Sequence, residues 1–487
     1  MIPKPLPLLA SIPLFFTACH HSGKQPNPDN VPAKPNIILL VADDHGTDAL
    51  GCYGNPVIKT PTLDKLATEG VRFTNAFCTS ASCSASRSTL LTGMYNHAIG
   101  HYGHAHSYHH FSTYDTVRSL PQYLADAGYH TARIGKYHLA PESVYNFREV
   151  LKCNPRSTVE MAEMCKDVLI GKEPFFLYFC FDDPHRGAPF KSDPWDIPNN
   201  FGNKPGGYPG ETVRKYSPDN VIVPAFLPDT KETREELAEY YQSVSRIDQG
   251  ISRLLQILSE SGKEDNTIII YISDNGIAFP GAKTTVYDPG IRLPCIIKTP
   301  QMGKSGIVNN AMISWVDMTP TILDFAGINP EEFSLQGKSF KNVLTEESPE
   351  GHDKIYASHT FHEITMYYPM RVVQDRRYKL IWNIAWQLPY PFASDLWASS
   401  TWQGVYRSGK THFGKRTVNT YMQRPEFELY DMINDPDELI NLAKNPEYRE
   451  IFIIMKEDLK EFQIRTLDPW MIMWDNVSVI QGTGVNL

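Results

Sequence analysis

The sequence has no cysteine pairs at the close spacing of a zinc ribbon and no excess of positive charge. The first absence argues against a ribbon-type zinc site, which needs such pairs. The second, a net charge of -9, argues against nucleic acid as the main partner but leaves room for a local cationic pocket. Hydrophobic content of 41% and a length of 487 residues indicate a globular protein of one large and one smaller domain, or two to three modest ones.

The N-terminal apolar run, within MIPKPLPLLASIPLFFTAC, is too short to span a membrane comfortably and lies where a signal peptide belongs. Thr17-Ala18-Cys19 resembles a bacterial lipoprotein cleavage box. We therefore expect residues 1–19 to be a signal peptide, residues 20–35 a polar linker, and the protein an exported lipoprotein, periplasmic or associated with an outer membrane. An ordinary secretory signal cut nearby is the alternative.

Setting Cys19 aside leaves seven of the eight cysteines, so at least one is unpaired.

Four short apolar runs end in polar residues: 37–42, a weaker run before Lys136, 175–181 and 268–272. Continuous runs of this length are typical of strands buried on both faces. Stretches with helical spacing separate them, and the longest ends near Gly262. This alternation predicts an α/β fold with a mainly parallel sheet, whose ligands bind at the carboxyl ends of the strands. One polar cluster alone would be a loop cap, but several with complementary chemistry predict a shared site.

The polar residues at these ends fall into three chemical groups. Oxygen ligands that suit Ca²⁺, or Mg²⁺, come from Asp43, Asp44, Asp274 and Asn275. Positive charge comes from Arg87, Lys136, Arg186 and Lys283. Proton transfer near neutral pH is available from His138 and His185. Together they suit a sulfuryl or phosphoryl group, which a metal polarises and cations stabilise.

The stretch ASCSASRSTLLTGMY identifies the chain as resembling the sulfatase family. Cys83-Ser84-Ala85-Ser86-Arg87 and Leu91-Thr92-Gly93 fit its signature, and ADDHG, GKYHLA, DPH, SDNG, KTTVYDPGIRLP and ELYDMINDPDELINLA fit its other motifs. The resemblance implies that a maturation enzyme converts Cys83 to formylglycine, the nucleophile. It implies the catalytic residues Cys83, Arg87, Lys136, His138, His185 and Lys283, and the metal ligands Asp43, Asp44, Cys83, Asp274 and Asn275.

Other stretches look closest to the N-sulfoglucosamine sulfohydrolases, the sulfamidases or heparan N-sulfatases of this family. They are HHFSTYDTVRSLP, FDDPHR, DNGIAFP and FHEITMYYPMRVVQ. This implies hydrolysis of N-linked sulfate from glucosamine in heparin or heparan sulfate fragments. The candidate substrate-binding residues are Asp183, Arg186, His362, Glu363 and Arg371. Lys283 departs from the arginine expected in the animal enzyme and matches the lysine that is usual in sulfatases generally.

The resemblance implies an alkaline-phosphatase-like sulfatase fold, with a catalytic domain over residues 36–350. Residues 351–487 would form a smaller α+β subdomain with an antiparallel sheet that contributes to the substrate pocket. Three other functions stay open: an O-sulfatase acting on 6-O- or 2-O-sulfated glycosaminoglycan sugars, a phosphodiester or phosphonate hydrolase, and a non-catalytic lipoprotein that binds sulfated glycans. Residues 97–110 hold six histidines, and the resemblance covers part of this stretch, including His109-His110-Phe111. It implies a pocket wall there rather than a transition-metal site. The aromatic-rich residues 386–409 are either a sugar-stacking wall or a packed irregular region.

Overall fold

The computed structural model describes residues 34–187, 197–300 and 302–474, together with Met1. The predicted signal peptide and most of the predicted linker lie outside this part. The cysteines within it, seven in number, are all free thiols, and Cys180 and Cys295 are buried as their apolar surroundings predict. No helix of the described ranges combines the length and apolar character needed to cross a membrane.

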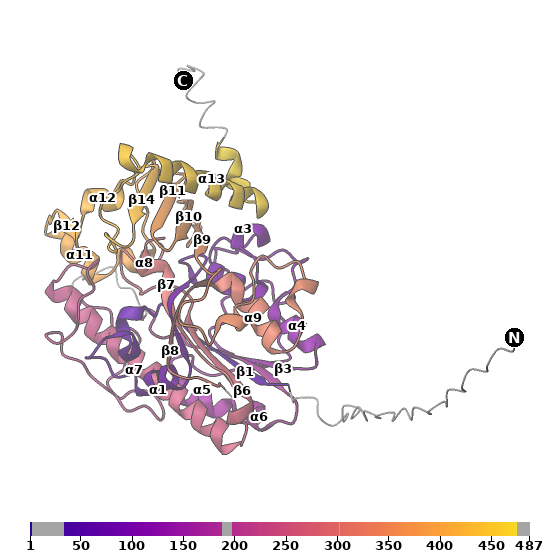
Figure 1. Cartoon of the computed structure of the whole chain (residues 1–487). Coiled ribbons are helices and arrows are strands. Elements are labelled where there is room, and N and C mark those ends of the chain that lie inside the picture. The colour runs from indigo at the N-terminus through magenta and orange to yellow at the C-terminus, as the bar shows by residue number, and fades with distance from the viewer. Residues whose placement is uncertain (2–33, 188–196, 301, 475–487) are drawn as a thin grey trace. The chain divides into compact units, whose positions relative to one another are not determined.

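An eight-stranded sheet forms the centre of the fold (Figure 1). Its spatial order is β4 (Glu149–Leu151), β3 (His130–Gly135), β5 (Phe175–Cys180), β1 (Asn36–Ala42), β6 (Thr267–Ser273), β7 (Arg292–Lys298), β2 (Val71–Phe77) and β8 (Ile307–Ser314). All pairings are parallel except those of β7 with β6 and β2. The predicted mainly parallel sheet is therefore confirmed.

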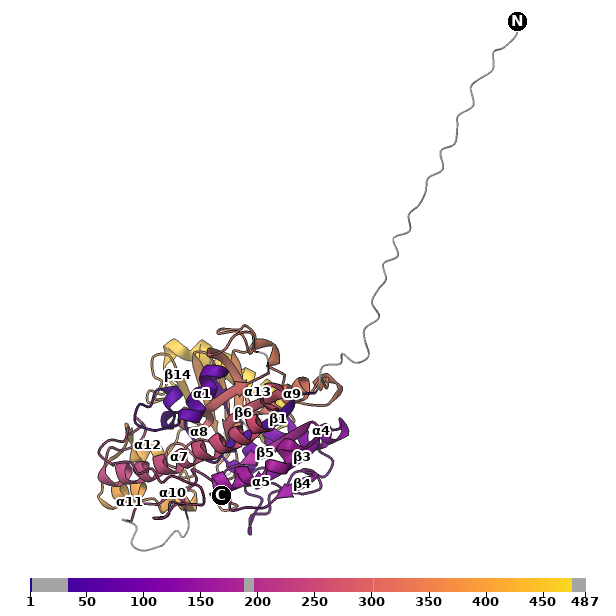
Figure 2. The same cartoon turned by 90° about the horizontal axis from the view of Figure 1, so that it is seen from below.

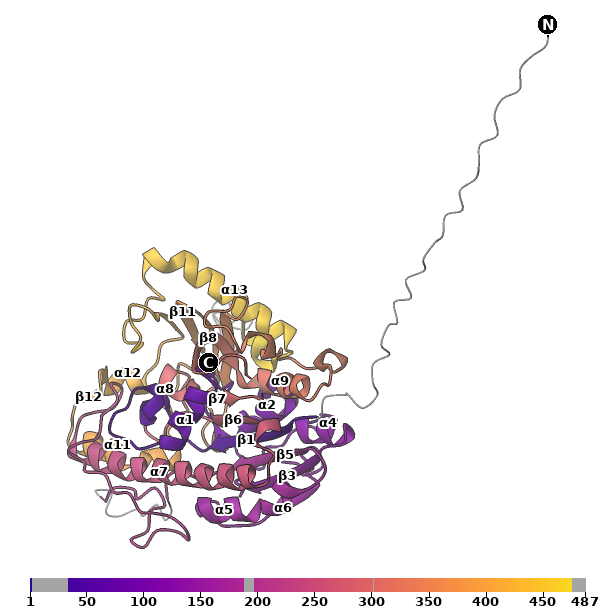
Figure 3. The same ribbon diagram turned by 60° about the horizontal axis from the view of Figure 1, so that its bottom comes forward.

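Both faces of this sheet are covered, which explains why its strands read as continuous apolar runs. Ile37, Leu39 and Val41 of β1 join one hydrophobic cluster, whereas Ile38 and Leu40 join the other. Successive side chains of a strand point to opposite faces, so each cluster takes alternate residues. Figures 2 and 3 show α7 and α5 together on one face.

The helices have the following bounds. They are α1 (Pro61–Glu69), α2 (Cys83–Thr92), α3 (Asn96–Ile99), α4 (Leu120–Asp126), α5 (Thr158–Met164), α6 (Lys166–Ile170), α7 (Lys231–Glu260), α8 (Asp288–Ile291), α9 (Met318–Phe325), α10 (Ser394–Trp397), α11 (Ser400–Arg407), α12 (Val418–Met422) and α13 (Arg449–Arg465). The long helix α7 ends at Glu260, and Gly262 follows with a φ of 71°. A left-handed glycine at this position is a common end of a helix, as the sequence predicted.

A second, antiparallel sheet of four strands follows in the C-terminal part of the chain. Its order is β14 (Phe427–Asp431), β11 (Tyr378–Asn383), β10 (Met370–Asp375) and β9 (Lys354–His359). A short two-stranded sheet pairs β12 (His412–Phe413) with β13 (Arg416–Thr417). Helix α13 packs on the four-stranded sheet through a third hydrophobic cluster that includes Leu380, Leu429 and Leu459. The antiparallel sheet is confirmed, and the domain boundary at residue 350 stays a prediction.

Candidate active site

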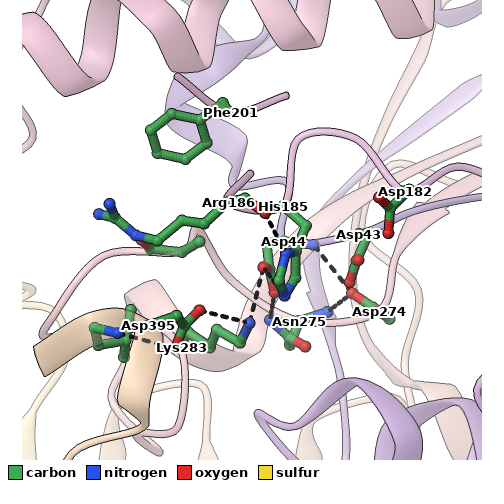
Figure 4. Close-up of polar contacts among 12 residues, drawn as sticks. Asp43, Asp44, Asp182, His185, Arg186, Phe201, Asp274, Asn275, Lys283 and Asp395 are labelled. Carbon is green, nitrogen blue, oxygen red and sulfur yellow. Dashed lines mark hydrogen bonds and ion pairs between the residues drawn. The ribbon is translucent and has the colours of Figure 1, made fainter. Parts of the chain in front are cut away.

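Two neighbouring strands bring four oxygen-bearing side chains together. Asp43 and Asp44 follow β1, while Asp274 and Asn275 follow β6, and the last residues of these strands are paired in register. The Asp44 amide donates to Asp274 Oδ1 at 3.1 Å, and Asn275 Nδ2 donates to Asp44 Oδ1 at 2.6 Å (Figure 4). All four residues are fully buried. The parallel register therefore assembles the predicted oxygen ligands at one edge of the sheet.

Each of the three carboxylates has a cationic partner. Lys136, which follows β3, pairs with Asp43. Lys283 Nζ lies 3.0 Å from Asp44 Oδ2. Arg87 Nε donates to Asp274 Oδ2 at 2.8 Å. The predicted cations and the predicted metal ligands are thus parts of one buried charge network.

The pKa values of the three carboxyl groups differ sharply. Burial raises the pKa of Asp44 to about 7, with Asp43 and Asp274 adding to the increase and Lys283 opposing it. Burial also raises the pKa of Asp274 to about 6, against the effect of Arg87. Burial acts upward on Asp43 as well, but Lys136, His185 and Arg87 hold its pKa below the ordinary value. Three crowded carboxylates favour one more positive charge among them.

Two buried oxygens in this cluster lack a hydrogen-bond partner: Asp43 Oδ1 and Asn275 Oδ1. Buried polar atoms are normally satisfied, so both are available to an ion. Asp43 and Asp274 also lie with Cys83 in a group whose ligand atoms are all within 4.8 Å of one another. Carboxylate and amide oxygens are the ligands of a hard divalent cation. The residues present therefore fit the predicted metal ion.

Cys83 is the first residue of α2, and Arg87 lies one turn further along the helix. Both side chains are fully buried. Burial raises the pKa of the Cys83 thiol to about 12, although Lys136 and Lys283 act in the opposite direction. A thiol of this pKa carries almost no thiolate at neutral pH and would be a poor nucleophile. This observation agrees with a role for Cys83 as a precursor whose thiol does no chemistry.

The two candidate proton-transfer groups differ in environment. His185 Nδ1 donates to the carbonyl oxygen of Arg186 at 2.9 Å, which leaves Nε2 as the unprotonated nitrogen of the neutral ring. That Nε2 lies 3.8 Å from Asp44 Oδ2. Burial, Lys283 and Lys136 lower the pKa of His185 to about 4. His138 contacts His106 through ring nitrogens, and burial together with Lys136 and His106 lowers its pKa well below the ordinary value.

Three predicted substrate-binding residues are committed to other partners. Asp183 accepts from Arg246 Nε at 2.6 Å and from Arg156 at 2.6 Å. Arg186 forms a two-pronged pair with Glu236, with distances of 2.6 and 3.0 Å. Arg371 pairs with Asp468 through Nε and through NH2, the latter at 2.9 Å. All three side chains are buried, and these contacts favour structural roles for them.

The other two predicted substrate-binding residues lie closer to the cluster. His362 Nδ1 and Ser82 Oγ are 3.0 Å apart, and Ser82 directly precedes Cys83. Glu363 Oε1 accepts from the amide of Ser394 at 2.9 Å and from its hydroxyl at 2.5 Å. The C-terminal part of the chain therefore reaches the start of α2.

Sequence reasoning missed Asp395 and did not select among the six histidines. Asp395 Oδ2 lies 3.3 Å from Lys283 Nζ, but it comes from the aromatic-rich stretch, where no spacing marks it. Of the histidine stretch, His104 and His106 approach His138, with ring centroids 4.8 and 4.4 Å away. His101 instead contacts Ser84 and Thr113. The number of histidines was a signal for the region but not for the individual residues.

Comparison with known proteins identifies the class of hydrolase that carries this arrangement. A family model described as Sulfatase matches residues 35–328, and one described as N-sulphoglucosamine sulphohydrolase, C-terminal, matches residues 281–388. The chain therefore belongs to the sulfatase family. Membership implies a formylglycine and a metal ion, and the buried Cys83 with its oxygen-rich surroundings fits both.

Individual relatives cover almost the whole chain. N-sulphoglucosamine sulphohydrolase of Homo sapiens is 37% identical over 470 residues, which cover 91% of this chain and 93% of the relative. An ulvan-active sulfatase of Formosa agariphila is 30% identical over 450 residues, covering 90% and 80%. A protein solved in complex with its substrate D-glucosamine-2-N,6-O-disulfate matches with a TM-score of 0.64 and 23% identity, covering 90% of this chain and 99% of the other. At that identity the last comparison shows a shared fold.

Proposed function

We propose that this sulfatase hydrolyses the N-linked sulfate of glucosamine residues in heparin or heparan sulfate fragments. The observation that carries the proposal is the 37% identity, over 91% of this chain, to a relative named N-sulphoglucosamine sulphohydrolase. The match of residues 281–388 to the C-terminal model of that name adds support, because it extends beyond the general sulfatase model. This range includes Lys283, His362 and Glu363.

A divalent cation would be held by Asp43, Asp44, Asp274 and Asn275, beside the side chain made from Cys83. Ca²⁺ suits these oxygen ligands, and Mg²⁺ is the other fit. When bound, the cation polarises a sulfate oxygen, and the formylglycine supplies the attacking oxygen. Asp43 Oδ1 and Asn275 Oδ1, which lack other partners, are the atoms most available to the cation.

The remaining residues either stabilise negative charge or transfer protons. Arg87, Lys136 and Lys283 lie around the carboxylate cluster, where they stabilise the charge of the sulfuryl group as it transfers. The hydrated form of formylglycine has two hydroxyls, and His138 would accept the proton of the second one when sulfate is expelled. His185 Nε2 delivers a proton to the leaving nitrogen. A bound sulfate anion favours the protonated ring and so opposes the burial that lowers the pKa of His185 to about 4.

The C-terminal residues 351–487 would complete the substrate pocket. His362 and Glu363 lie where they can line it, because they contact Ser82 and Ser394 close to the reacting group. Asp183, Arg186 and Arg371 are assigned to the fold on the strength of their ion pairs.

Export and lipid attachment at Cys19 are part of the proposal and rest on the sequence alone. A Cys19→Ala variant should be released from the membrane fraction of a bacterial host, whereas the unchanged protein should remain in it. Equal distribution of both proteins would contradict a lipid anchor.

Sulfate release tests the proposed activity. Protein with confirmed conversion of Cys83 would be incubated with N-sulfoglucosamine and with 6-O-sulfated N-acetylglucosamine, and Cys83→Ala would serve as the blank. We expect release from the N-sulfated sugar. Release from the O-sulfated sugar alone would keep the family and the mechanism but overturn the substrate. Binding of a sulfated glycan without release from either sugar would favour a binding protein.

A further inference from the structure

Asp395 brings a fourth carboxylate to the site from a distant part of the chain. It lies on α10 and is buried, and its Oδ2 is 3.3 Å from Lys283 Nζ. The same Nζ is 3.0 Å from Asp44 Oδ2, so Lys283 lies between two carboxylates (Figure 4). His185 Nε2 lies 3.8 Å from the same oxygen, Asp44 Oδ2. Asp395 therefore borders the cluster of residues that would bind the sulfate, and this cluster includes His185, the proposed proton donor.

The local structure holds Asp395 in one orientation. Its Oδ1 accepts from the amide of Leu396 at 2.9 Å. The preceding Ser394 is tied to Glu363 by both its amide and its hydroxyl, at 2.9 and 2.5 Å. A carboxylate has about four acceptor positions, and these contacts with Lys283 and Leu396 use two of them. Asp395 can therefore accept further hydrogen bonds from a bound sugar.

Asp395 is an anion at neutral pH. Burial acts to raise the pKa of its carboxyl group, but Lys283, His185 and His362 together hold it well below the ordinary value. An anion beside Lys283 partly cancels the charge that would attract sulfate, so it opposes the binding of a sulfate group. A carboxylate at this position would be favourable if another part of the substrate becomes positively charged during the reaction.

N-linked and O-linked sulfates differ in that respect. Cleavage of a sulfamate breaks the S–N bond as an oxygen nucleophile bonds to sulfur; the bonding pair stays on nitrogen, which takes a proton from His185. The resulting amine takes a second proton from water near neutral pH and becomes an ammonium group. Cleavage of a sulfate ester instead leaves a neutral hydroxyl.

We propose that Asp395 is a specificity-determining residue that favours N-linked over O-linked sulfate by accepting hydrogen bonds from the leaving nitrogen. This inference rests on the proposed function. The alternative is a structural role in which Asp395 only neutralises buried Lys283. The two roles predict different effects of replacing Asp395. Loss of a purely structural partner would lower activity on every sulfated substrate alike, whereas loss of a specificity residue would lower it on N-linked sulfate alone.

The test compares Asp395→Asn with the unchanged protein, both with Cys83 converted. Asparagine keeps the size of the side chain and the acceptor for Leu396. For N-sulfoglucosamine we expect kcat/KM to fall about 10- to 100-fold, the effect of one hydrogen bond to a charged group, and mainly in kcat. For 4-nitrophenyl sulfate, whose leaving group needs no proton, we expect no fall in kcat/KM, because the variant removes an anion that opposes sulfate binding at Lys283. Equal losses on both substrates, or none on either, would overturn the proposal.

Product inhibition gives a second and independent measurement. Glucosamine carries an ammonium group at C2, and N-acetylglucosamine matches its ring without that charge. We expect Asp395→Asn to weaken inhibition by glucosamine about tenfold, again the effect of a hydrogen bond to a charged group, and to leave inhibition by N-acetylglucosamine unchanged. Unchanged inhibition by both sugars would contradict the proposal even if the variant lost stability. A wild-type protein inactive on N-sulfoglucosamine would overturn the proposed function itself, and this inference with it.

Discussion

At the scale of single residues, the partner of each buried charge shows which predicted site residues belong to the carboxylate cluster and which lie outside it. Arg87 pairs with Asp274, inside the carboxylate cluster. Arg371 pairs with Asp468, outside it. Both arginines are fully buried. The sequence predicted a site role for each, catalytic for Arg87 and substrate-binding for Arg371. The sequence could not tell them apart, because an ion pair between residues 97 positions apart is set by the folded chain.

Arg371→Ala should reduce stability rather than substrate binding. It leaves Asp468 buried without its cation, which costs about 3–5 kcal/mol. Urea denaturation measures this loss, and steady-state kinetics on the folded protein should give an unchanged KM. The control is Lys354→Ala on the neighbouring strand β9, because Lys354 is exposed and its pair with Asp458 is worth at most about 1 kcal/mol.

The same pair predicts a dependence on pH. Burial acts to raise the pKa of Asp468, but Arg371 holds it below the ordinary value. The stability that the pair contributes is therefore complete above about pH 4, the usual carboxyl range, and is lost as the pH falls further. The urea midpoints of wild type and Arg371→Ala should converge in acid. A higher KM with unchanged stability would instead restore Arg371 as a substrate contact.

At the scale of elements, the predicted site lies at the carboxyl ends of strands, and the sequence predicted closely where these strands end. The apolar runs and their polar terminal residues predicted where β1, β5 and β6 finish, because strands buried on both faces leave a clear pattern. Helix α2 begins at Cys83 and carries Arg87 four residues further on, on the same face of the helix. The sequence does not show how closely the ends of two neighbouring strands approach each other. Gly135, the last residue of β3, is an example.

Gly135→Ala should impair both stability and catalysis. Gly135 ends β3 with a φ of 83°, and a Cβ there would lie 1.9 Å from the carbonyl oxygen of Cys180. The neighbouring strand or Lys136 must then move. Gly128→Ala is the matched control, since Gly128 has a φ of 85° but nothing within 4 Å of the added Cβ. The control should lose only about 1–2 kcal/mol, the cost of a left-handed alanine.

Thermal unfolding and kcat/KM separate the two glycine variants. We expect Gly135→Ala to unfold at a lower temperature than Gly128→Ala and to lose activity in its folded fraction. Equal behaviour of both variants would mean that the contact with Cys180 relaxes without displacing Lys136.

At the scale of the whole molecule, the predicted metal site can form only in the folded chain, since Asp43 and Asp274 are 231 positions apart in the sequence. A cation that binds only the folded state stabilises it by about 2.7 kcal/mol at one hundred times its Kd. Chelation should therefore lower the melting temperature, and Ca²⁺ should restore it. Asp43→Asn is the control and should respond less. A melting temperature unaffected by chelation and by added Ca²⁺ or Mg²⁺ would contradict the site.

The sequence by itself determined the sulfatase family and the mainly parallel sheet, and it predicted the oxygen ligands and the role of Cys83. These features are local: a run of apolar residues, a motif, a polar residue at the end of a strand. Only the tertiary structure decided which cation pairs with which carboxylate, and it alone showed the roles of Arg371 and Asp183 in ion pairs. It also brought Asp395 to Lys283, across 112 positions of the chain. Burial and pairing depend on contacts between distant segments, and no local pattern records them.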